Sequence, residues 1–186
     1  MTANEEKFRS VRPLVVRNDT IATLSGAAWM YFGYKYLPFL VPEVNGIADQ
    51  LVYALRWQIP ATALIMYLAY DTANERIKTG TIDPVDPALK KDPESLTARK
   101  NILQNTIEQM ALHSPNMLVL ATYLRQDQLK MIPLLSILFV VGRLWYRRGY
   151  LNTSSLRAGR SGGMWMTFIP TLAIIGYNLF RLFKPC

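Results

Sequence analysis

Polar and ionisable side chains lie within otherwise apolar stretches of this chain, where they are the first candidates for chemistry. The run Gln104-Asn105-Thr106-Ile107-Glu108-Gln109 interrupts an apolar segment from about 101 to 124. Asn105 and Glu108 are three residues apart, so they share one face of a helix. Ionisable groups are costly inside a membrane, so this face must meet other helices or a polar ligand. Hydrogen bonding between helices remains an open alternative for Asn105 and Gln109.

A second group follows the next apolar segment and carries positive charge and phenols. Tyr146 and Tyr150 are four residues apart, Arg143 is on the same side, and Arg157 follows closely. An interfacial belt of aromatic and basic residues explains many of these positions. The group also suits a small ligand with amine and carboxylate groups, with Glu108 for the amine and the arginines for the carboxylates.

The elements that must position these residues are five apolar segments, each near the roughly twenty residues that cross a bilayer as a helix. They run from about 21 to 41, 51 to 70, 101 to 124, 129 to 146 and 163 to 180. We therefore predict an all-α integral membrane protein. Its parts are a cytosolic tail (1–20), an extra transmembrane helix (21–41), and a four-helix membrane domain (51–183) with a cytosolic loop (71–98).

Composition excludes several other classes of protein. The chain has 186 residues, of which 51% are hydrophobic and 18% charged, whereas a soluble domain carries about a quarter charged residues. The net charge of +8 comes mainly from basic connections that share one side of the membrane, which places the N-terminus in the cytosol. This explanation is preferred to nucleic-acid binding. The single histidine and single cysteine, Cys186, cannot form a zinc or haem site without other ligands.

These residues resemble a known family. The pair Asn105 and Glu108 after the basic residues Arg99-Lys100, followed by Arg143, Tyr146, Gly149-Tyr150 and Arg157, is similar to the MAPEG family, the membrane-associated proteins in eicosanoid and glutathione metabolism. The resemblance covers about 51 to 180. The runs Lys130–Leu135 and Thr167–Pro170, with the extra N-terminal span, resemble the mattrin-type branch.

The resemblance implies a four-helix bundle in each subunit, a homotrimer, and glutathione as cofactor between subunits near the cytosolic face. It implies that Arg157 stabilises the glutathione thiolate, because nearby positive charge lowers a thiol pKa. The residues predicted to bind glutathione are Asn105, Glu108, Gln109, Arg143, Tyr146, Tyr150 and Arg99.

The function implied is a glutathione-dependent transferase or peroxidase acting on a hydrophobic electrophile or lipid hydroperoxide, in the endoplasmic reticulum or another endomembrane. The predicted partners are membrane lipid and a hydrophobic small-molecule substrate. Two positions depart from the family pattern: Asn101 stands where arginine is frequent, and Gln109 where some members have tyrosine. The alternative is therefore a non-catalytic membrane regulator or lipid-binding scaffold of the same fold.

Overall fold

Nearly all of the described chain is helical, and Pro38 and Pro60 mark two of the helix boundaries. The computed structural model describes residues 3–39, 41–80, 92–152 and 159–184. Its helices are α1 (Ala3–Tyr36), α2 (Ile47–Arg56), α3 (Ile59–Lys78), α4 (Glu94–Tyr123), α5 (Met131–Leu151) and α6 (Arg160–Phe183), with a short 3-10 turn η1 (Gln126–Gln128) before α5. These described stretches contain no strand, which confirms the predicted all-α class.

The predicted second span is one apolar run divided into two helices. α2 ends at Arg56 and α3 begins at Ile59, because Pro60 in the first turn of α3 lacks the N–H that would continue the α2 ladder. The carbonyl of Trp57 in this break accepts a hydrogen bond from the Ser136 hydroxyl of α5. The break is therefore satisfied by a neighbouring helix, as backbone inside a membrane must be.

Several helices are longer than the apolar segments predicted. α1 starts at Ala3 rather than near residue 21, and it ends at Tyr36 because Pro38 follows. α3 continues to Lys78 and α4 begins at Glu94, so the predicted loop 71–98 is helical at both ends. The apolar run indicates only the length of helix that can face lipid. The helices continue beyond it because charged residues at helix ends do not interrupt the backbone hydrogen bonds.

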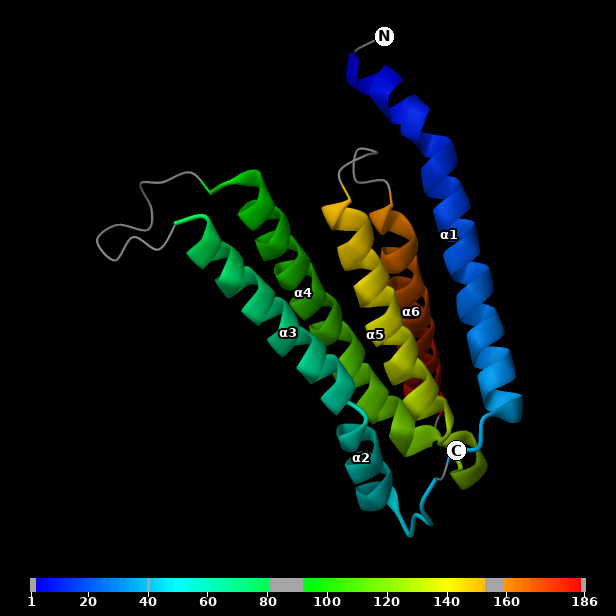
Figure 1. The fold of residues 1–186 in the computed structure, drawn as a ribbon. Helices are drawn as coiled ribbons and strands as arrows, with labels where there is room; N and C mark the ends of the chain where they lie inside the picture. Colours follow the sequence, from blue (N-terminus) through cyan, green and yellow to red (C-terminus); the bar gives the residue numbers. More distant parts are fainter. Residues whose placement is uncertain (1–2, 40, 81–91, 153–158, 185–186) are drawn as a thin grey trace.

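The helices form one bundle with α1 on its outer side (Figure 1). α3 packs on α4, α4 packs on α5 and α6, and α1 lies along α5 and α6. Three helical stretches, Ile47–Lys78, Gln126–Leu151 and Arg160–Phe183, are long and apolar enough to cross a membrane. α1 and α4 are more polar, and for α4 this polarity is concentrated at the site described next.

Candidate functional site

Arg143 of α5 is the most buried charged residue of the described chain, with 0% of its surface exposed. Its guanidinium reaches α4, where Nη2 donates to Asn105 Oδ1 at 2.8 Å. Nε and Nη2 also donate to the Thr106 hydroxyl at 3.2 and 3.1 Å. Adjacent positions of α4 therefore bind one arginine, and α5 is fixed against α4 at this level.

The charge of Arg143 has no carboxylate partner among the described residues. The guanidinium carbon lies 4.1 Å from the centroid of the Tyr146 ring, one turn further along α5. Its Nη1 atom is buried and has no hydrogen-bond partner in the part of the chain that the structure describes. The buried Arg143 cation is thus stabilised by the dipoles of Asn105 and Thr106 and by the face of the Tyr146 ring, where a buried cation ordinarily requires an anion. The site therefore has a positive potential that favours a negatively charged ligand nearby.

Asn105 and Glu108 present polar atoms on the outer side of α4. An arginine has only donors, so the Asn105 carbonyl oxygen must face Arg143 and its Nδ2 must face away. The Glu108 side chain is exposed, and its Oε1 accepts a hydrogen bond from Gln104 Nε2 at 3.0 Å. The outer face of α4 thus offers an amide donor and a carboxylate one turn apart, which can bind a carboxylate or carbonyl and an amine.

Tyr150 connects this face to α6. Its hydroxyl accepts from Asn101 Nδ2 at 3.2 Å, and its ring lies 4.9 Å from the Arg160 guanidinium at the start of α6. The Tyr146 and Tyr150 rings are 5.7 Å apart between centroids, and both are buried. The two tyrosines therefore extend from the Arg143 group to the end of the bundle. Arg157, the predicted thiol-activating residue, lies outside the described residues.

Arg99 lies in a separate group of ion pairs between α3, α4 and α5. Its Nε lies 3.4 Å from Asp71 Oδ1, and its Nη1 lies 3.3 Å from Glu75 Oε1. Asp71 also accepts from Arg147 at 2.8 Å. Sequence reasoning missed Asp71 and Arg147 because it treated Asp71 as the start of a loop. An acid directly after an apolar run, matched by basic residues at the same membrane side, was the available signal.

Gln109 is predicted to bind ligand but points into the bundle, with 6% of its surface exposed. One turn further along α4, His113 Nδ1 lies 3.0 Å from the Thr171 hydroxyl of α6 and its ring stacks on Phe139 at 4.7 Å. The buried Gln109 Oε1 has no partner. The structure therefore brings together Asn105, Arg143 and Tyr146, and it separates Gln109 and Arg99 from the outer face that carries Glu108.

Two further observations concern the neighbours of Arg143 and the metal-ligating side chains. Thr106, a buried residue that the sequence did not single out, holds Arg143 through its hydroxyl, which also donates to the Ile102 carbonyl at 2.7 Å. Among residues with described positions, no group of three histidine, cysteine or acidic side chains could hold a metal ion.

Comparison with known proteins matches this region. The model of the MAPEG family matches residues 55–180, which include the whole site and exclude α1. The chain is 30% identical over 154 residues to Transmembrane protein 79 of Mus musculus and 28% identical over 154 residues to that of Bos taurus. Each match covers 83% of this chain, which spans only 38% and 37% of the two relatives. No solved structure matches the chain.

Proposed function

Because this chain belongs to the MAPEG family, a family of membrane proteins, we propose that the outer face of α4 binds glutathione for transfer to, or reduction of, a hydrophobic substrate. The observation that carries the proposal is the buried Arg143, which has no carboxylate partner among the described residues and which orients the Asn105 amide. Glutathione has two carboxylates, one ammonium group and a thiol. Its charges complement this arrangement.

Glu108 and Asn105 are the proposed contacts to the peptide. The free Oε2 of Glu108 would accept from the ligand ammonium, while Oε1 stays bound to Gln104. The outward Nδ2 of Asn105 would donate to a ligand carboxylate or carbonyl. Charge-assisted hydrogen bonds of this type contribute about 1.5–3 kcal/mol each.

Arg143 acts as a positioning residue in this proposal. With 0% exposure, its guanidinium holds the Asn105 carbonyl oxygen inward and supplies a positive potential to the ligand carboxylates. Tyr150 completes the site through its hydroxyl, which Asn101 already binds. The proposal assigns Arg99 and Gln109 no contact with the ligand, because Arg99 pairs with two carboxylates and Gln109 faces the interior.

The proposed assembly is a homotrimer. Asn101, Gln104 and Glu108 are exposed on a helix of a membrane protein, where contact with lipid would be costly. A neighbouring protomer that covered this face would close the glutathione site between subunits. The basic residues near the ends of α3 and α5 would put the site at the cytosolic surface.

The proposed chemistry begins with the glutathione thiolate. Arg157 would stabilise the thiolate by its charge and lower the thiol pKa. The sulfur would then attack an electrophilic carbon and form a thioether as the leaving group departs as its anion. With a lipid hydroperoxide it would attack the terminal oxygen instead, so that the O–O bond breaks, the alkoxide takes a proton from water to become an alcohol, and glutathione sulfenic acid forms. A second glutathione would convert the sulfenic acid to the disulfide and water.

Titration calorimetry on the purified protein in detergent tests the binding. We expect one glutathione per protomer, and about 10- to 100-fold weaker binding for Glu108→Gln, which corresponds to one charge-assisted contact. Arg143→Lys keeps the charge but loses the fork that orients Asn105, so it should weaken binding as well. The matched control is Glu43→Gln, an exposed carboxylate far along the chain from the site.

The thiolate is tested separately by its ultraviolet absorbance in the complex. Arg157→Ala should retain binding and lose the thiolate signal. A folded wild-type protein that binds no glutathione would refute the proposal and favour the non-catalytic scaffold, because the fold can persist without the chemistry.

A further inference from the structure

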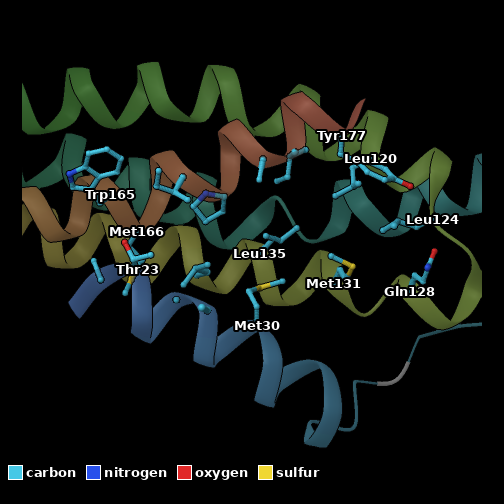
Figure 2. A pocket seen from close by; sticks show the side chains of 18 residues that line it. Thr23, Met30, Leu120, Leu124, Gln128, Met131, Leu135, Trp165, Met166 and Tyr177 are labelled. Carbon is cyan, nitrogen blue, oxygen red and sulfur yellow. The ribbon is translucent and has the colours of Figure 1, made fainter. Parts of the chain in front are cut away.

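A separate apolar slot lies between α1 and the pair α5 and α6, with Leu120 and Leu124 of α4 at one end, and Arg143 is not among its lining residues. The slot has a volume of about 450 Å³. Eighteen residues line it, among them Ala22, Gly26, Leu135, Leu138, Trp165 and Ile169. Figure 2 shows it as a long space along α6, with Trp165 near one end and Gln128 near the other. The helix α1, which lies outside the matched family region, forms one wall.

Contacts at both ends of the slot hold α1 against the bundle. At the end near the start of α6, the Asn18 carbonyl of α1 approaches Gly162 closely. A Cβ added to Gly162 would lie 2.9 Å from the Asn18 carbonyl oxygen. Toward the other end, Trp29 Nε1 donates to the Leu134 carbonyl at 3.0 Å. Between these contacts α1 presents mostly small residues, including Ala22, Gly26 and Ala27, so the space is a consequence of side-chain size rather than of a loose helix.

The dimensions of the slot suit a lipid chain and not a helix. From Trp165 to Tyr177 along α6 a rise of 1.5 Å per residue makes it about 18 Å long, comparable to one leaflet of a hydrocarbon core about 30 Å thick. A volume of about 450 Å³ spread over this length makes a narrow slot, which fits an extended hydrocarbon chain better than a helix roughly 10 Å in diameter.

Two lysines stand where the slot continues toward the membrane surface. A wider hollow shares Ala27, Met30 and Met131 with the slot, and adds Tyr31, Tyr34, Lys35 and Lys130. Lys130 Nζ lies 4.0 Å from the Tyr34 ring centroid and Lys35 Nζ 5.3 Å from that of Tyr36. Neither lysine lies within 4.0 Å of a carboxylate in the described residues. The end of the slot is therefore cationic.

We infer that this slot binds an anionic amphiphile, with its acyl chain along α6 and its anionic head at Lys35 and Lys130. The shared chemistry is a long hydrocarbon chain with a phosphate or carboxylate head, which a membrane phospholipid or a free fatty acid can supply. Leu138 and Met166 line the slot, whereas Arg143 is not among its lining residues and binds Asn105 of α4. The bound lipid is therefore distinct from a substrate at the glutathione site, and the inference stands without the proposed function.

Native mass spectrometry of the delipidated protein tests this site with three probes: palmitate, phosphatidylglycerol and the zwitterionic phosphatidylcholine. We expect one anionic lipid per protomer, bound at least tenfold more tightly than phosphatidylcholine. Binding of palmitate alone would identify a fatty-acid site, and binding of phosphatidylglycerol alone a phospholipid site; either supports the inference. Equal binding of all three probes would overturn it.

Three variants locate the lipid. Ala27→Trp fills the slot from α1 and Ala173→Trp fills it from α6, so each should reduce binding of the anionic probes about tenfold or more. The double change Lys35→Glu and Lys130→Glu should remove the preference for anionic heads and leave phosphatidylcholine unaffected.

Lys184→Glu is the matched control, because Lys184 is an exposed lysine at the same end of the bundle and outside the slot. It should change neither affinity nor preference. Unchanged lipid binding in both tryptophan variants would refute the slot. A shift in oligomeric state without lipid loss would show that a second copy of the chain covers this face, which would also overturn the inference.

Discussion

The sharpest stability prediction concerns two glycines of α6 that differ only in their surroundings. At Gly163 a Cβ would lie 2.6 Å from the Gly142 carbonyl oxygen and 2.7 Å from Tyr146 Cα, and closer still to the Tyr146 backbone nitrogen. At Gly176 a Cβ would meet no heavy atom of the described residues within 4 Å, apart from its chain neighbours and the backbone of its own helix. The same substitution, glycine to alanine, therefore tests packing against α5 with the chemistry held constant.

The magnitude follows from the separation that the new methyl group requires. Ordinary contact begins at 3.4 Å, so at Gly163 the backbones of α5 and α6 must separate by a little over 1 Å to clear the closest atom, the Tyr146 backbone nitrogen. Overpacking of this kind costs about 1–3 kcal/mol. Alanine gains about 1 kcal/mol over glycine in helix propensity at either position. We expect Gly163→Ala to lose up to about 2 kcal/mol net and Gly176→Ala to be neutral or up to about 1 kcal/mol more stable.

Unfolding of both variants in detergent, followed by circular dichroism against temperature, measures the difference. For a chain of this size each kcal/mol corresponds to about 2–4 °C, so Gly163→Ala should melt several degrees below Gly176→Ala. If both alanine variants melt together, the close approach of α5 and α6 at Gly163 is wrong. Gly163→Ala should also weaken glutathione binding, because the methyl group displaces the turn that carries Tyr146.

Two further predictions concern polar contacts between helices. Asp71→Asn leaves the half-buried Arg147 without its carboxylate and should lower the free energy of unfolding by about 1–2 kcal/mol. The control is Asp127→Asn, in an exposed pair with Arg125, which should change that free energy by less than about 0.5 kcal/mol in the same melts. Trp29→Phe removes the bond to the Leu134 carbonyl and should cost about 1 kcal/mol; hydrogen exchange should then increase in α1 and not in α4. Equal protection of α1 in this variant and the wild type would contradict that role for Trp29.

Part of the candidate site follows from sequence spacing alone. Asn105 and Glu108 are three residues apart, and a helix necessarily puts them on one broad face. Tyr146 and Tyr150 are likewise one turn apart on α5, and their rings do lie together. Such relations are local, because the helical repeat determines them without knowledge of any other helix.

Other parts of the site depend on which helices are neighbours. That Arg143 binds Asn105 and Thr106 required α5 to lie against α4 in one rotational setting, which no periodicity in either segment reveals. Arg99 resembled a ligand residue by its place before the Asn105 motif, yet Asp71 and Glu75 of α3 pair with it. The sequence does not show which of several basic side chains pairs with a given carboxylate. The distance between the charged groups in the folded protein decides which ion pair forms.

The amino-acid sequence by itself determined the all-α membrane class, because hydrocarbon thickness and backbone hydrogen bonding allow few alternatives. It also determined which residues share a helical face. Tertiary structure alone decided that α1 lies along α5 and α6, that a slot remains between them, and that Arg143 is buried against α4. The physical reason is that helix formation is governed by neighbours in sequence, whereas packing depends on the shapes of side chains that are distant in sequence and meet only when the bundle assembles.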